Sequence, residues 1–173
     1  GIFVNGDRLA ILGSNYSMSR VMPYFWTQVV ESRTYVSLYN VSDKAKPSLL
    51  RNFTMTGDYL NSRMIGKYVY FVTSQPAYVL YDTVVLPKVY SGEGVKEIPA
   101  PEIHYSNVSD DYFSFTTFVA MNMQDASEEP THTSIMVGAT SNMYVSSSNI
   151  YVTFRETSGE TSIYRVHMQD NNL

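Results

Sequence analysis

Apolar residues in this chain occur in short runs that are separated by turns rich in Gly, Pro, Ser and Asp. No window of about a dozen residues carries an apolar stripe at helical spacing that is free of Gly, Pro or β-branched runs. The run YVYFV at 68–72 is instead apolar at consecutive positions, which is typical of strands that are buried on both faces. The pattern therefore predicts an all-β fold in which sheets cover one another.

Three segments of the chain align without gaps, and each begins with Thr and ends with Asp. They are TYVSLYNVSD at 34–43, TTFVAMNMQD at 116–125 and TSIYRVHMQD at 161–170. Their apolar columns do not alternate strictly by two, which favours strands with two covered faces and a bulge. One polar column holds Asn40, Asn122 and His167, so we interpret His167 as a structural replacement of an Asn.

The Asp that closes each segment predicts a turn. The carboxylates of Asp43, Asp125 and Asp170 can accept hydrogen bonds from backbone N–H groups two residues further on. Pro47 and Pro130 follow the first two, as turns favour. We therefore expect each segment to be a strand that ends at its Asp.

A second phrase is also repeated. NSRMIGKYVYFVT at 61–73 is echoed by NMYVSSSNIYVTF at 142–154, and GDRLAILGS at 6–14 has the same order of turn and apolar strand. After the Asp of the first two segments comes one further strand, SLLRNFTMTG at 48–57 or THTSIMVG at 131–138. Units of four strands that repeat along a chain are the signature of β-propeller blades.

The spacing of the repeat indicates an insertion. The Thr residues that open the three segments are 82 and then 45 residues apart, and 45 residues is an ordinary length for one blade. The middle unit therefore carries about 37 extra residues, which we assign to an insertion at 75–113, rich in Pro, Gly and Tyr. We expect this insertion to form a protruding arm between the second and third strands of its blade. A plain β-sandwich is the alternative fold, and the 45-residue repeat argues against it.

The chain is thus predicted to be a single propeller segment, 1–173. Blade 1 spans about 1–57, blade 2 about 58–138 and an incomplete blade 3 about 139–173. Propellers generally close with four to eight blades. We therefore expect a fragment of a larger propeller, or an open arc that closes by pairing with a second copy of the chain, because bare apolar faces are rare on soluble monomers.

Composition places the chain among globular proteins. Of its 173 residues, 44% are apolar and 16% are charged, which is enough for one domain with a core. The net charge is −4 and no cluster of Lys and Arg occurs, so we expect no nucleic-acid partner. The absence of Cys excludes disulfides, thiol catalysis and thiolate metal sites.

Four Asn-x-Ser/Thr sequons favour an exported protein. The candidate glycosylation sites are Asn15, Asn40, Asn52 and Asn107, where roughly two matches are expected by chance. No apolar run is long enough to span a bilayer, and the first residues lack the features of a signal peptide. If the protein is exported, we expect its signal to lie upstream of this segment.

Several stretches resemble a known family. VSDKAKPSLLRNFTMTGDYLNSRMIGKYVYFVT, then VVLPKV, GEGVKEIPAPEIHY, FTTFVAMNM and SNMYVSSSNIYVTF resemble archaeal and bacterial secreted proteins that contain a C-terminal β-propeller domain. The resemblance covers most of the chain, including the insertion, and is weakest at 14–33. It implies an extracellular or membrane-anchored propeller that is remotely related to WD-type repeats, and it carries over no catalytic residues.

The residues that suggest chemistry have simpler structural interpretations. His104, His132 and His167 lack metal-ligand spacing, and Asp110-Asp111 with Glu102 supplies too few oxygens for calcium. We interpret the acids at 128–129 as the charged tip of a hairpin. No Gly-x-Ser-x-Gly motif is present. The sequence therefore assigns no catalytic, cofactor-binding or metal-binding residue, and no cofactor.

Trp26 is the one candidate for surface recognition. It lies in MPYFW, an aromatic cluster outside the repeat. It either packs within a blade, which we favour, or stacks a sugar or peptide at the rim.

The sequence thus predicts a non-catalytic binding or scaffold module, secreted or at the cell surface, with an unknown protein or glycan ligand. Its membrane anchor, if it has one, would lie outside this segment. The alternative is part of an exported enzyme, for example a glycan-processing one, whose site is completed by other blades. That alternative requires carboxylates that converge from different blades.

Overall fold

Almost all regular structure in the protein is β-strand, because its apolar runs are rich in Val, Ile, Tyr and Phe, which pack well on pleated sheets. The computed structural model describes all residues except 21–27, 81, 92–93, 106–111 and 139. Within the described residues the only helix is a single 3₁₀ turn, η1 (Ala100–Glu102). The prediction of an all-β fold is confirmed.

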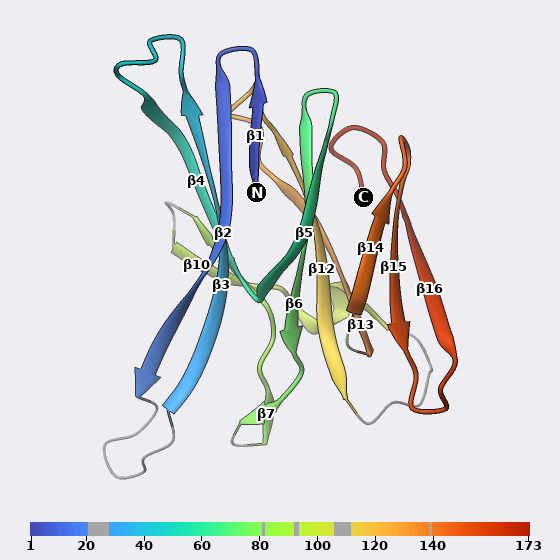
Figure 1. Ribbon diagram of the computed structural model, residues 1–173. Coiled ribbons are helices and arrows are strands. Elements are labelled where there is room, and N and C mark those ends of the chain that lie inside the picture. Colours follow the sequence, from blue (N-terminus) through green and yellow to red (C-terminus); the bar gives the residue numbers. More distant parts are fainter. Residues whose placement is uncertain (21–27, 81, 92–93, 106–111, 139) are drawn as a thin grey trace.

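Three mainly antiparallel sheets stand side by side in the order of the sequence (Figure 1). The first sheet contains β1 (Ile2–Asn5), β2 (Arg8–Arg20), β3 (Gln28–Asn40), β4 (Ser48–Thr56), β9 (Lys88–Ser91) and β10 (Gly94–Glu97), in that spatial order. The middle sheet has the order β11 (Ile103–Tyr105), β13 (Thr131–Gly138), β12 (Phe113–Asn122), β6 (Tyr68–Pro76) and β5 (Asp58–Ile65). The third sheet contains β14 (Thr140–Val145), β15 (Asn149–Arg155) and β16 (Thr161–His167), and β7 (Val79–Leu80) pairs with β8 (Thr83–Val84).

The middle sheet is covered on both faces by its neighbours. Phe71 of β6 and Met121 of β12 belong to the apolar layer shared with the first sheet. Tyr70 of β6 and Phe118 of β12 belong to the layer shared with the third sheet. Because successive residues of a strand point to opposite faces, a strand between two apolar layers must be apolar at every position. This arrangement explains the continuous apolar run at 68–72.

The repeated phrase of the sequence is also repeated as a pairing register. Asn61 pairs with Val72, and 81 residues later Asn142 pairs with Thr153. In both hairpins the register shifts just before the Asn, so a β-bulge recurs at the same position of the repeat. The two hairpins therefore fold alike because their sequences share both the turn and the bulge.

Two of the three predicted Asp turns form as expected. Asp43 Oδ1 accepts from the Ala45 N–H at 2.9 Å, and Asp125 Oδ1 accepts from the Ser127 N–H at 2.9 Å. Asp170 makes a different turn, with a left-handed φ of 54°, and its backbone carbonyl accepts the Tyr70 hydroxyl at 2.8 Å. The last segment thus ends by anchoring the chain to the middle sheet.

The prediction that 75–113 forms a protruding arm is wrong for much of this insertion. β9 adds to the edge of β4, and β11 pairs in parallel with β13, so much of the insertion extends the first and middle sheets. Edge strands expose unpaired backbone groups, and these pairings satisfy part of them. Among the described strands of the insertion, β7 and β8 pair only with each other and lie outside the first and middle sheets (Figure 1).

Limited proteolysis should therefore cut the β7–β8 hairpin first. Its strands are only two residues long, and Val79 and Val84 are 65% and 44% exposed, whereas β9 and β11 are held in sheets. A protease of low specificity, with the fragments identified by mass spectrometry, measures the order of cleavage. A first cut within 88–97 or 103–105 would show that the insertion is not bound to the sheet edges.

Candidate functional site

The outer edge of the first sheet is only partly covered. β9 pairs with residues 54–55 of β4, and residues 48–53 have no partner strand on that side among the described residues. The Gly57 N–H donates to the Ser32 carbonyl, toward β3, at 2.8 Å. Because backbone direction alternates along a strand, the N–H and C=O of Asn52 point away from β3, toward the open edge.

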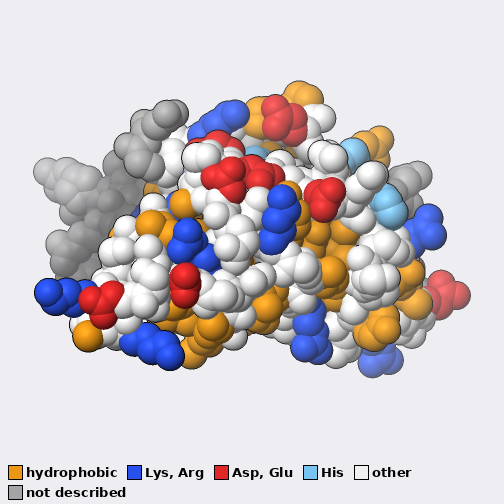
Figure 2. Space-filling model, turned by 90° about the horizontal axis from the view of Figure 1, so that it is seen from above, with side chains coloured by type: hydrophobic (Ala, Val, Ile, Leu, Met, Phe, Trp, Pro, Cys, Tyr) orange, Lys and Arg blue, Asp and Glu red, His pale blue; other side chains and the backbone are white. Residues whose placement is uncertain are grey.

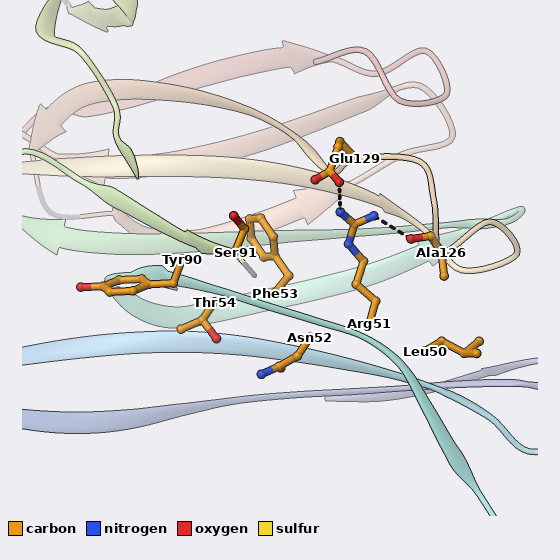
Figure 3. Close-up of a pocket in the computed structure, with 9 residues that line it drawn as sticks. All are labelled: Leu50, Arg51, Asn52, Phe53, Thr54, Tyr90, Ser91, Ala126 and Glu129. Carbon is orange, nitrogen blue, oxygen red and sulfur yellow. Dashed lines mark hydrogen bonds and ion pairs between the residues drawn. The ribbon is translucent and has the colours of Figure 1, made fainter. Parts of the chain in front are cut away.

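A cleft of about 630 Å³ lies along this open edge (Figure 3). It is lined by residues 50–54 of β4, by Tyr90 and Ser91 of β9, and by Ala126 and Glu129 of the turn after β12. Arg51 and Phe53 reach toward the middle sheet, and Asn52 and Thr54 point to the other side (Figure 3). Five consecutive residues from both faces of a strand line the cleft, so it follows the backbone edge. We call it the edge cleft.

Arg51 fixes one wall of the edge cleft. Its Nη1 donates to the carbonyls of Ala126 and Glu128, at 2.8 and 2.7 Å, and its Nη2 pairs with the Glu129 carboxylate. The Arg51 side chain is only 15% exposed. Its bonds join β4 to a turn that lies 75 residues later in the chain, so the cleft has a rigid wall.

The acids at 128–129 are more than the charged tip of a hairpin. Glu129 is exposed and pairs with Arg51, as a tip residue can. Glu128 is half-buried and accepts from the Tyr68 hydroxyl at 3.2 Å and from Asn122 Nδ2 at 2.5 Å. Sequence reasoning did not find the role of Arg51, because nothing in the neighbourhood of a strand Arg indicates partners so far along the chain.

A smaller pocket, of about 200 Å³, lies where the connection between β4 and β5 meets the end of β6. Its lining includes Tyr16, Glu31, Asp58, Gln75 and Tyr78. These residues come from the β2–β3 hairpin, from β5 and β6, and from the insertion. We call it the polar pocket. No sequence motif indicated it, because its members are scattered over four segments.

A hydrogen-bonded cluster connects the polar pocket with β9. Glu31 Oε1 accepts from Arg33 Nε at 2.6 Å and from the Tyr90 hydroxyl at 2.8 Å, and the Arg33 guanidinium lies 4.2 Å from the Tyr90 ring centre. Burial alone would raise the pKa of Glu31, but the hydrogen bonds from Tyr90 and Arg33 and the charge of Arg33 outweigh it, so this pKa is lowered. Burial, and then the contact with Glu31, raises the pKa of Tyr90 to about 12. Glu31 is therefore an ionised acceptor.

The tyrosines make the fold sensitive to alkali. The pKa values of Tyr70 and Tyr90 are raised to about 12 in the folded protein, against an ordinary value of 10.0. Their contribution to stability is thus complete below about pH 10 and is lost as the pH rises toward about 12. Urea unfolding at about pH 8 and about pH 11 measures how much free energy of unfolding each protein loses between the two pH values. Tyr90→Phe should lose less than the parent protein. Tyr105→Phe, at an exposed position, is the control and should lose as much as the parent; equal losses in all three would contradict the assignment.

The histidines do not come together as a metal site. Among the described residues, no group of three or more His, Asp or Glu could hold a metal ion. His104 lies on β11 and His132 on β13, where burial lowers the pKa of His132. His167 ends β16, with its Nδ1 3.4 Å from Asn149 Oδ1, at the position of the repeat that Asn122 occupies in β12.

The structure describes only some of the sequence-derived candidates. Asn15 and Asn52 are exposed on β2 and β4, and Asn40 is half-buried at the end of β3. Trp26, Asn107, Asp110 and Asp111 lie outside the described residues. Asn52 lines the edge cleft, so a sequon and the open backbone edge coincide there.

The charge on the upper face of the molecule is mixed (Figure 2). Seen from above, acidic and basic side chains are interspersed with apolar ones, and no continuous basic surface covers this face (Figure 2). The expectation of no nucleic-acid partner stays a prediction. None of the described segments forms a helix with the length and hydrophobicity that a membrane crossing requires.

Stacked antiparallel sheets, repeated hairpins with one register, and clefts at their edges define a repeat protein of the propeller type. A family model described as a beta propeller domain matches residues 1–173, so the chain belongs to this family. No curated protein and no solved structure was found to match. The predicted partial propeller is thereby supported as a fold class, and the number and bounds of its blades stay a prediction.

Proposed function

We propose that this protein is a non-catalytic binding or scaffold module that takes an extended segment of a partner protein as an added strand on β4. The open edge of β4 beside the edge cleft is the observation that carries the proposal. Strand addition satisfies the free backbone groups of an edge and gives affinity without a particular side chain. A β-propeller domain is consistent with this role.

The chain itself uses strand addition at this edge. β9 comes from the insertion, far from the β2–β3–β4 hairpins, and it pairs with β4 only at residues 54–55. A partner strand placed beside residues 48–53 would continue the line of β9 along the same edge. Arg51 and the turn that it holds would form the opposite wall, and Leu50, 39% exposed, would offer an apolar contact.

We also propose that the protein acts outside the cell, secreted or at the cell surface. Support comes from the sequons, of which Asn15 and Asn52 are exposed, and from the family resemblance of the sequence. A glycan on Asn52 would stand at the edge cleft, so occupancy of this sequon and strand addition would compete.

The alternative is that the chain is part of an exported glycan-processing enzyme, and the polar pocket gives this alternative little support. Such enzymes pair a protonated carboxylic acid with an ionised carboxylate. Glu31 and Asp58 line one pocket, but the pKa of Glu31 is lowered, which suits an acceptor and does not suit a proton donor. The pocket therefore favours binding over glycoside hydrolysis.

Peptides selected from a random displayed library against the protein test the strand-addition proposal. Asn52→Pro removes the outward N–H of the edge, whereas Asn52→Thr removes the same side chain and sequon but keeps the N–H. We expect selected peptides to bind Asn52→Thr as they bind the parent, and to bind Asn52→Pro up to about tenfold more weakly, because Pro lacks the N–H that donates one hydrogen bond to the peptide.

Hydrogen exchange of the bound complex supplies the second readout. Bound peptide should slow the exchange of the Asn52 amide. The amide N–H of Phe53 points toward β3, so its exchange should not change. Failure to select any peptide, or equal binding of the parent and Asn52→Pro, would reject the edge of β4 as a docking site. Thermal unfolding of both variants confirms that each is folded.

A further inference from the structure

We infer that the polar pocket is a binding site for an organic cation, an alkylammonium or guanidinium group such as the head of a Lys or Arg side chain. The pocket is a separate hollow from the edge cleft, although Tyr90 of the cleft donates to Glu31 of the pocket, and the inference goes beyond the proposed function. It rests on the hydrogen-bonding inventory of the residues that line the pocket and on their charge.

The pocket contains one buried acceptor that lacks a donor. Gln75 is 8% exposed, and its Nε2 donates to the Val85 carbonyl at 2.9 Å, which fixes the orientation of the amide. Its Oε1 is buried and has no hydrogen-bond partner. An acceptor left in this state is costly, and native proteins rarely keep one without a reason. Gln75 therefore offers its Oε1 to a ligand that brings a hydrogen-bond donor.

The two carboxylates of the pocket, Glu31 and Asp58, differ in whether a cation is paired with them. Glu31 uses Oε1 for Arg33 and Tyr90, and the charge of Arg33 balances it. Asp58 accepts only from the Ser32 hydroxyl, at 2.5 Å, and no cation pairs with it among the described residues. No Lys, Arg or His is among the described residues that line the pocket. The positive charges of Arg33 and Lys88 act on Glu31, and the carboxylate of Asp58 is left without an ion pair among the described residues.

The walls of the pocket suit a cation with an apolar stem. Tyr16 and Tyr78 line it, and aromatic faces attract ammonium and guanidinium groups. The volume of about 200 Å³ accommodates one such head and part of its stem. A neutral sugar would satisfy the Gln75 acceptor as well, but it would leave the charge of Asp58 without a counter-ion. Because Asp58 has no ion pair, a cation suits the pocket better than a neutral sugar does.

Arginine amide is the probe, with methyl glucoside as the neutral comparison, in titrations followed by amide NMR on the whole 173-residue chain. We expect arginine amide to shift the amides of Asp58 and Gln75 with saturation, and the affinity to fall as salt is added. Asp58→Asn keeps the size and the contact with Ser32 but removes the charge, and it should weaken binding about tenfold or more. Asp7→Asn makes the same charge change in the exposed β1–β2 turn and should have no effect.

Gln75→Leu is a second, independent variant. It removes the unpartnered acceptor, so it should weaken the binding of arginine amide. It also removes the bond from Gln75 Nε2 to the Val85 carbonyl, so thermal unfolding is measured alongside to show that the variant is folded. Equal affinities in the parent and in Asp58→Asn would overturn the inference. The absence of saturable shifts, or shifts of the same amides by methyl glucoside alone, would overturn it too, the latter in favour of a sugar site. None of these results bears on strand addition at β4.

Discussion

Phe118→Ala should lower the free energy of unfolding by about 3–5 kcal/mol, whereas Ile163→Ala should lower it by less than about 1 kcal/mol. The two residues occupy the same column of the sequence repeat. Phe118 is fully buried between the middle and third sheets, and Ile163 is 66% exposed on the outer face of the third sheet. Removing the Phe118 ring leaves a cavity between two sheets, and removing the Ile163 side chain leaves none. Urea unfolding of the two variants and the parent measures the difference.

This pair of variants also reports on what covers the third sheet. If Ile163→Ala costs as much as a core substitution, another surface packs on this face in solution. A small cost for Phe118→Ala would contradict the stacking of the middle and third sheets.

We further expect the 173-residue chain to self-associate at micromolar concentration and to bind an apolar dye. The outer face of the third sheet has a hollow of about 460 Å³, whose lining includes Tyr144 and Ile163, 68% and 66% exposed. At the opposite end of the stack, Ile2 and Val4 of β1 are 70% and 59% exposed. Such faces bury apolar area when a second sheet packs on them.

The outer faces of the first and third sheets correspond, within the repeat, to the two opposite faces of the middle sheet. Val4 pairs with Leu9 as Met64 pairs with Val69, so the outer face of the first sheet corresponds to the face that the middle sheet turns to the first. The outer face of the third sheet corresponds in the same way to the face that the middle sheet turns to the third. Head-to-tail packing of two copies would therefore repeat contacts that the chain already makes.

A double variant, Tyr144→Ser with Ile163→Ser, should weaken this association at least about tenfold in light scattering and sedimentation. Tyr105→Ser, at a position 74% exposed on β11, removes a comparable apolar side chain and should leave association unchanged. A monodisperse monomer that binds no dye would show that these faces need no cover.

The strands and their pairing register could be predicted from the sequence, because both depend on local patterns. Gly6 and Gly66 each adopt a φ of 59° at a hairpin turn, where Gly meets no steric cost, and Asn5 pairs with Arg8 just as Ile65 pairs with Tyr68. Apolar runs with β-branched and aromatic residues then extend from each turn. The turn sets the register, so aligned sequences gave aligned hairpins.

The tertiary structure alone decided which face of each repeat is covered and where the clefts lie. Phe118 and Ile163 share a column, yet only one has a sheet in front of it, and a column of sequence carries no information about that neighbour. The insertion was recognisable by its length, but its attachment to the edges of β4 and β13 depends on backbone groups that every sequence possesses. Arg51, whose partners follow 75 and 77 residues later, and the polar pocket, built from four segments, likewise form only when distant parts of the chain pack together.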